Sequence, residues 1–179
     1  ALGLNPDDYI SLTSFTHHPF YSKFALEIED NWRWAESYNI PIDEFMRVME
    51  TAIDKGYTIA WGSDVSEKGF TRDGIAVLPD IEEIETKGSD QARWIGLSYT
   101  ERQNYINQMV HRADVPEVEP TQEYRQKGYD NYELTDDHGM VIYGIAKNQI
   151  GRKFFMVKNS WGEAGKYKGH WYASYNFVK

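Results

Sequence analysis

The feature that most constrains the fold is a pair of apolar runs separated by turn-forming residues in the last third of the sequence. The run 140–147 is rich in β-branched side chains, and the run 153–158 reads KFFMVK. Between them lies the segment 148–151, whose glycine can adopt the positive φ that a tight turn often needs. This pattern predicts an antiparallel hairpin centred between residues 149 and 150.

The predicted hairpin brings a histidine and an asparagine together at one edge. With that centre, His138 lies nearly opposite position 161 and within about one pleat of Asn159, because antiparallel neighbours are roughly 5 Å apart. An asparagine oxygen can accept the Nδ1 proton of an imidazole, which leaves Nε2 free to exchange a proton with a nucleophile. Trp161 could cover this hydrogen bond. The alternative is an ordinary hairpin with a surface histidine and an asparagine at a strand end.

The residues around this pair resemble those of a known family. The runs DHGM (137–140) and VKNSWG (157–162) resemble the histidine and asparagine motifs of the papain-like cysteine peptidases. Three further runs are similar to the bleomycin hydrolase and aminopeptidase C branch of that family: SFTHHPFY (14–21), NIPIDEFMRVMETAIDKGYTIAWGSDV (39–65) and TQEYRQKGYDNYELTDDHGM (121–140). The resemblance covers most of the chain and weakens over residues 66–93.

The resemblance implies roles for single residues. His138 would be the catalytic base and Asn159 the residue that orients it. Gly62 and Gly139 would border the substrate pocket, although Gly62 could equally mark a β-bulge. From its position next to the histidine, Asp137 could raise the pKa of the imidazole, or it could point to solvent.

The chain departs from the family in two respects. It contains no cysteine, and nothing in it resembles the segment that carries the nucleophile. It also ends at Lys179, short of the tail that enters the cleft in this branch. The resemblance therefore implies the C-terminal part of a peptidase, inactive alone, whose partner is the N-terminal Cys-bearing half of the same protein. A closed homo-oligomer is a further expectation from this branch.

The implied fold class is α+β: the right-hand half of a papain-like fold, with an antiparallel barrel-like sheet and flanking helices. At 179 residues, the chain fits a single domain, 1–179, with a helical and loop insertion at about 66–133. The net charge of −9 argues against nucleic acid or an anionic membrane as partner, and no run of about 18 apolar residues is present. The sequence implies no metal or organic cofactor and leaves the cellular compartment open.

Other segments carry conventional signals. Pro41 predicts a helix start and Lys55-Gly56 its end, with a buried apolar stripe between them. The remaining expectations are a strand at 57–65, surface loops with one short strand over 66–93, a helix capped by Ser98 or Thr100 and ending near 111, a helix at 122–132 broken at Gly128, and a closing strand at 170–178.

Two aromatic-rich segments invite other interpretations. The adjacent His17 and His18 suggest a metal site, but no further ligand lies close in sequence, so we expect loop histidines that pack on Phe20 and Tyr21. The tryptophans at 32 and 34 are expected in the core or at a domain interface.

The leading functional hypothesis is a cysteine aminopeptidase that hydrolyses peptide or aminoacyl amide bonds. The alternative is a non-catalytic module of the same fold that binds peptides, and a metal hydrolase using the paired histidines is a weaker third. Retention of both His138 and Asn159 favours the enzyme, since a binding module has no need for the pair.

Overall fold

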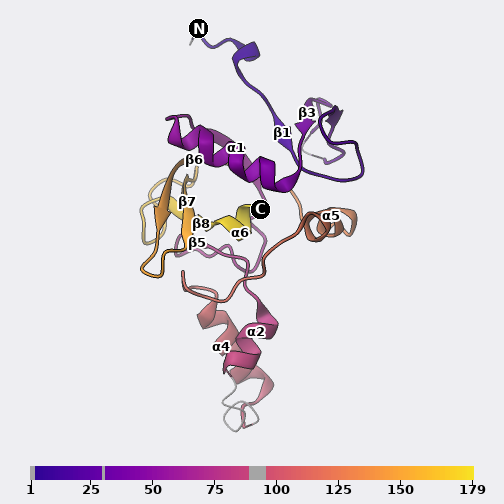
Figure 1. Ribbon diagram of the computed structural model, residues 1–179. Coiled ribbons are helices and arrows are strands. Elements are labelled where there is room, and N and C mark those ends of the chain that lie inside the picture. The colour runs from indigo at the N-terminus through magenta and orange to yellow at the C-terminus, as the bar shows by residue number, and fades with distance from the viewer. Residues whose placement is uncertain (1–2, 30, 89–95) are drawn as a thin grey trace.

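The computed structural model describes residues 3–29, 31–88 and 96–179. It has a mixed α and β architecture, with a small sheet and a larger sheet that are both accompanied by helices (Figure 1). In chain order the elements are η1 (Pro6–Asp8), β1 (Leu12–Thr13), β2 (Lys23–Ala25), β3 (Glu36–Asn39), α1 (Ile42–Asp54), β4 (Ile59–Ser63), β5 (Ile75–Ala76), α2 (Ile81–Gly88), α4 (Tyr99–Met109), α5 (Gln122–Asp130), β6 (His138–Lys147), β7 (Lys153–Lys158), β8 (His170–Ser174) and α6 (Tyr175–Val178).

The larger sheet has the strand order β4-β6-β7-β8-β5. Its strands are antiparallel except at one edge, where β5 runs parallel to β8. Its edge strands β4 and β5 do not pair with each other within the described ranges, so the sheet is open and does not form a closed barrel there. The α+β class is confirmed. No helix among the described residues is long and apolar enough to span a bilayer.

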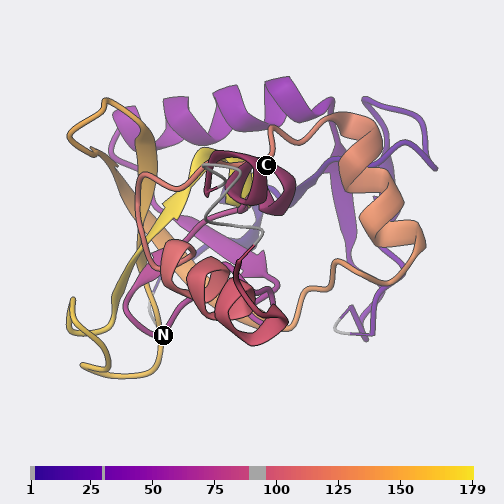
Figure 2. The same ribbon diagram turned by 90° about the horizontal axis from the view of Figure 1, so that it is seen from below.

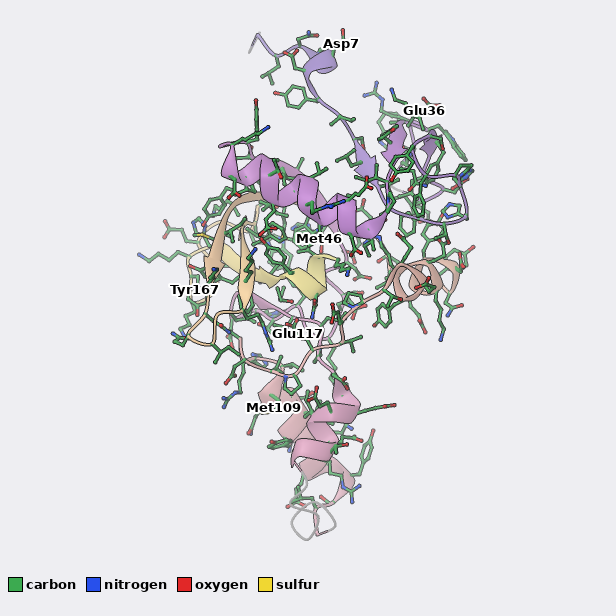
Figure 3. The ribbon with its side chains drawn as sticks, viewed as in Figure 1. Asp7, Glu36, Met46, Met109, Glu117 and Tyr167 are labelled. Atoms are coloured by element: carbon green, nitrogen blue, oxygen red, sulfur yellow. The ribbon has the colours of Figure 1, made fainter. Side chains whose placement is uncertain are left out.

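Helix α1 lies along one face of the larger sheet (Figures 1 and 2). It begins after Pro41, which occupies the N-cap position, and ends at Lys55, so the predicted helix is confirmed. Its side chains Met46 and Met49 are buried against the sheet, toward which Met46 points (Figure 3). The sheet residues buried in the same cluster are Met140, Ile142, Phe155, Val157, Trp171 and Ala173.

Helices α2 and α4 pack beside each other at the opposite side of the molecule from α1 (Figure 1). They share a second core, made of Ile75, Val77, Ile84, Ile106, Val115 and Phe154. The short strand predicted near residue 75 is confirmed as β5, but the acidic run predicted as solvated loop is helix α2. Asp80 caps this helix by accepting the Glu83 N–H at 2.8 Å, and Ile84 is buried on its inner side.

The other two predicted helices also form, each with one refinement. Helix α4 is capped by Ser98 and Glu101 in a reciprocal capping box, so the first of the two predicted caps is used. Helix α5 runs through Gly128 without a break, contrary to the prediction. The glycine provides space: a Cβ there would lie 2.5 Å from side-chain atoms of Leu134.

The central hairpin is confirmed, and its register contains one irregularity. At the turn, Lys147 pairs with Lys153, which centres the loop on residue 150. A β-bulge between Ile142 and Gly144 then shifts the register, so that Ile142 pairs with Val157. From the bulge to the far end, the register is the one predicted from the sequence.

Two further predictions need comment. Trp32 and Trp34 are 78% and 67% exposed, so neither belongs to the core of this chain, and the other predicted place for them, a domain interface, stays a prediction. The closing strand ends at Ser174, whose hydroxyl accepts the Phe177 N–H at 3.1 Å and so begins the short helix α6.

Candidate active site

The hairpin places His138 and Asn159 together at the end of the larger sheet, away from the turn. His138 is the first residue of β6, and Asn159 directly follows β7. The imidazole Nε2 lies 2.8 Å from the carboxamide Oδ1. Because a carbonyl oxygen can only accept, the imidazole carries a proton on Nε2, and Nδ1 is the nitrogen left to exchange a proton with another group.

The sequence suggests Nδ1 for this hydrogen bond, and the structure corrects the assignment to Nε2. Since Val141 pairs with Lys158, the position opposite His138 is 161, and Asn159 is its diagonal neighbour. Diagonal neighbours across a sheet are about 7–8 Å apart. Nε2 lies farther from the backbone than Nδ1, so it is the nitrogen that reaches across.

The ring of Trp161, which is 45% exposed, lies beside the imidazole. The Trp161 ring lies 5.0 Å from the imidazole, centroid to centroid, and is in turn contacted edge-on by Trp171 at 5.6 Å and Phe70 at 6.1 Å. Trp171 is fixed because its indole N–H donates to the carbonyl of Thr71 at 2.9 Å. Asn159 is only 2% exposed, so its hydrogen bond lies in a desolvated environment that strengthens it. Trp161 therefore lies where the sequence predicts, beside the imidazole.

A carboxylate that sequence reasoning missed holds the chain just before the histidine. Asp64 accepts the N–H and the hydroxyl of Thr135, both at 3.0 Å, and the N–H and hydroxyl of Ser66 at 2.8 and 2.7 Å. Burial opposes ionisation of this carboxylate, but the hydrogen bonds outweigh it and hold the pKa of Asp64 below its usual value. Because Ser63 pairs with His138, this cluster fixes how the chain enters β6.

Asp137 lies beside this cluster and bonds to the backbone. Its carboxylate accepts the Val65 N–H at 3.0 Å, and its own N–H donates to the Ser63 carbonyl at 3.3 Å. These bonds extend the β4–β6 ladder beyond its last strand residue. Of the two alternatives predicted for Asp137, the structure shows the exposed one, and the exposed carboxylate also holds the strand ends together.

Gly62 and Gly139 pair directly with each other in the β4–β6 ladder. The pairing is unbroken from Ile59 to Ser63, so Gly62 does not mark a bulge. A side chain at Gly62 would overlap the carboxylate of Asp136, whereas one at Gly139 would meet open space. Both glycines border an open groove of about 490 Å³, whose other lining residues are Ala60, Trp61, Met140, Val141, Lys158, Asn159 and Ser160.

The loop after Asn159 is anchored by its own backbone. The Asn159 N–H donates to the carbonyl of Gly169 at 3.0 Å, and Lys158 Nζ donates to the carbonyls of Gly162 and Gly169. Gly169 has a φ of 80°, and a Cβ there would overlap the Gly162 carbonyl, so the close return of the loop requires glycine. This anchoring holds the asparagine and the tryptophan in place.

These supporting residues carry only partial signals in the sequence. Asp64 and Thr135 are 71 residues apart, and their contact depends on the β4–β6 pairing. Trp171 lies in the segment 170–178, for which the sequence predicts only a closing strand. Among the described residues, a group with metal-ligand spacing lies in a different part of the chain, at His17, His18 and Glu27.

Comparison with known proteins identifies the fold. Neither a protein-family model nor a curated protein matches the sequence. By contrast, 29 chains of solved structures match. One is the crystal structure of PepW from Lactobacillus rhamnosis HN001, with a TM-score of 0.60 and 22% identity over 98% of this chain. The shared property is the fold. The chain spans 34% of the PepW chain, so the similarity concerns about a third of that protein.

Proposed function

We propose that this chain is the His- and Asn-bearing part of a papain-like cysteine peptidase of the aminopeptidase type. The observation that carries the proposal is the 2.8 Å contact between His138 Nε2 and Asn159 Oδ1, with the ring of Trp161 beside it. The DHGM and KNSWG motifs that carry these residues, and the fold shared with part of PepW, support it.

In this mechanism, His138 acts through Nδ1, because Asn159 holds Nε2. The sequence has no cysteine, so a separate Cys-bearing segment of the same protein would supply the thiol. His138 takes the thiol proton, and the thiolate attacks the amide carbonyl to form a tetrahedral intermediate. The imidazolium then protonates the leaving amine as the intermediate collapses to a thioester, and water hydrolyses the thioester to release the acid. No metal or organic cofactor takes part.

The groove beside Gly62 and Gly139 is the proposed place for part of the peptide substrate. A side chain at Gly139 would occupy open space, so its absence lets a substrate approach the backbone there, whereas the Asp136 carboxylate fills the corresponding space at Gly62. Preference for a free N-terminus, and assembly into a closed homo-oligomer, are implied by the family resemblance.

The test is an assay of the gene product that includes the thiol-bearing segment, with a fluorogenic aminoacyl amide as substrate. The wild type should be active and lose activity to a thiol-specific alkylating agent. His138→Ala should be silent, whereas His111→Ala, a change at an exposed histidine that pairs with Asp73, should leave activity unchanged.

Two results would contradict the proposal. One is full activity of His138→Ala. The other is an inactive wild type under reducing conditions on a panel of aminoacyl and peptidyl substrates, which would favour the alternative of a peptide-binding module without catalysis.

A further inference from the structure

Two histidines and a glutamate, all outside the candidate active site, have the spacing of metal ligands. His17 Nε2 lies 3.2 Å from one carboxylate oxygen of Glu27, and His18 Nε2 lies 3.1 Å from the other. One ligand atom from each residue lies within 4.8 Å of the other two. When zinc is bound tetrahedrally at about 2.0–2.1 Å, neighbouring ligand atoms are about 3.3 Å apart. The three side chains are therefore close to the separation that a single ion requires.

The fold brings these residues together from both ends of strand β2. The two histidines lie in the loop before β2, and Glu27 lies two residues after it. The loop is fixed by Asn39, which is fully buried. Its carboxamide nitrogen donates to the carbonyls of Phe15 and His18 at 2.8 and 3.0 Å, and its oxygen accepts the Phe15 N–H at 3.0 Å. The backbone of the loop is thus held in place without a metal ion.

Aromatic rings hold the two imidazoles in their orientations. His17 stacks on Tyr129 of helix α5, with centroids 4.9 Å apart and planes 10° apart. His18 stacks on Phe24 of β2 at 4.1 Å. The sequence predicts that these histidines pack on aromatic rings, and they do. The predicted partners, Phe20 and Tyr21, are wrong: the rings are those of Phe24 and Tyr129. Fixed rings reduce the conformational entropy lost when a ligand binds.

Helix α5 also contacts His17 Nδ1, the ring nitrogen that does not contact Glu27. The Gln126 carboxamide nitrogen lies 3.1 Å from Nδ1 and donates to it, while the carboxamide oxygen lies 3.5 Å from Nδ1 and accepts the Thr16 N–H. When Nε2 binds a metal, Nδ1 carries the proton, and the Gln126 oxygen is the atom near it that can accept that proton. The His17 and His18 side chains are 26% and 35% exposed, so an ion can reach them from solvent.

We infer that His17, His18 and Glu27 bind one divalent transition-metal ion, with zinc the best match. Two imidazoles and a carboxylate are a ligand set that zinc accepts, and three protein ligands leave one position for water. The ion would tie the loop before β2 to the segment after it, on a surface supported by α5. This site is independent of the proposed peptidase chemistry at His138.

The experiment is a calorimetric titration of the chelator-treated, dialysed protein with zinc chloride. The expected result is one zinc per chain, with affinity at least tenfold weaker in His18→Ala and in Glu27→Gln. The matched control is His111→Ala, because His111 Nδ1 lies 2.8 Å from an Asp73 oxygen in a pair with no second histidine. This control should bind zinc as the wild type does. The cobalt(II) form should show the intense visible absorption of tetrahedral coordination.

A second measurement needs no variant. Zinc should raise the Tm of the wild type, and magnesium at the same concentration should not, because magnesium prefers octahedral oxygen ligands. The inference fails if the folded wild type binds no zinc. It also fails if His18→Ala and Glu27→Gln, shown by circular dichroism to be folded, bind zinc as tightly as the wild type. If His111→Ala abolishes zinc binding while His18→Ala and Glu27→Gln do not, the metal lies at His111, and the inference also fails.

Discussion

Asn159 is the residue on which the geometry around His138 most depends. Its Oδ1 holds the imidazole, its backbone N–H fixes the return of the following loop through Gly169, and it is buried. No partner for its Nδ2 exists among the described residues. An unsatisfied buried N–H group destabilises the fold, so the carboxamide does not stabilise the fold through its nitrogen. Its contribution is the oxygen that holds the imidazole.

Replacing the Asn159 carboxamide should therefore change the tautomer and orientation of the His138 imidazole more than it changes the stability of the fold. We expect Asn159→Ala to lower kcat/KM about 10²-fold in the thiol-bearing protein, because the ring loses its fixed tautomer. Nitrogen NMR of His138 should show a predominant Nε2–H form in the wild type and a mixture of tautomers in the variant. Gln149→Ala, which removes an exposed carboxamide in the hairpin turn, is the control and should change neither quantity. An unchanged tautomer in Asn159→Ala would contradict the assigned role.

Asp64 leads to a prediction about pH. Because hydrogen bonds hold its pKa below the unfolded value of about 4, its stabilising contribution is complete above that value and is lost as pH falls through the folded pKa. Asp64→Asn should therefore have a lower Tm than the wild type at pH 7, and the difference should shrink as the pH falls through the lowered pKa of folded Asp64, because the carboxylate then becomes neutral. Asp7→Asn, at an exposed position of η1, is the control. A Tm difference that stays constant with pH would argue against a contribution from the charge.

At the scale of elements, the sequence predicts those structures whose signals are local. The hairpin follows from two apolar runs and a turn, and α1 follows from its cap residues and apolar stripe. The bulge at Tyr143 is different, because the Tyr143 hydroxyl lies 2.8 Å from His170 Nδ1 on β8, a contact with a residue 27 positions away. The predicted turn centre differed from the observed one, and the bulge restores the predicted register at His138. The local sequence pattern predicts neither the observed turn centre nor the bulge.

The errors at α2 and α5 have the same origin. The acidic run at 81–88 forms a helix because Ile84 has a partner core to pack against, which the sequence does not show. Gly128 was interpreted as a helix breaker, yet its role is to make room for Leu134. The cluster at Glu27 was missed because Glu27 lies after β2, 10 and 9 residues from His17 and His18, and only the fold brings the three side chains together. In each case, the decisive contact joins residues that the fold brings together, and no helical or strand periodicity in the sequence relates them.

Gly128 offers a test of this explanation. Glycine to alanine in a helix interior normally stabilises by about 1 kcal/mol. Here, we expect Gly128→Ala to destabilise by about 1–2 kcal/mol, because the new methyl group would overlap the Leu134 side chain. In a Leu134→Ala background, the same change should become neutral or stabilising. The measurement is a double-mutant cycle by urea unfolding. If Gly128→Ala has the same effect in both backgrounds, the contact with Leu134 does not explain the glycine.

At the scale of the whole molecule, helix α5 connects the parts that surround it. Its residues Gln122, Arg125, Gln126 and Tyr129 lie three and four positions apart, on one side of the helix. Gln122 Oε1 accepts the Ile42 N–H at the start of α1 at 2.9 Å and the Ser14 hydroxyl at 3.2 Å. Further along the same side of the helix, Gln126 and Tyr129 contact His17 of the proposed metal site. One face of a nine-residue helix thus touches the small sheet, α1 and the loop that carries the paired histidines.

Arg125 is the strongest of these connections and gives the last prediction. Its guanidinium donates to the main-chain oxygens of Ser14 and Lys179, both at 3.1 Å, and lies 4.8 Å above the ring of Phe15. Burial lowers its pKa to about 10, so it remains charged at neutral pH and its hydrogen bonds are charge-assisted. Arg125→Ala should lower the free energy of unfolding by about 3 kcal/mol, since hydrogen bonds from a charged group contribute about 1.5–3 kcal/mol each and two of them are lost.

The matched control is Arg47→Ala on the outer side of α1, where the side chain is 73% exposed and its nearest carboxylate oxygen, on Glu44, is 3.8 Å away. That change should stay within about 0.5 kcal/mol. Urea unfolding followed by tryptophan fluorescence gives both values. Because Arg125 joins the segment after β1 to the main-chain oxygen of Lys179, its removal should shift the midpoint of the urea transition to lower concentration. An unchanged midpoint would show that these contacts of Arg125 do not stabilise the fold.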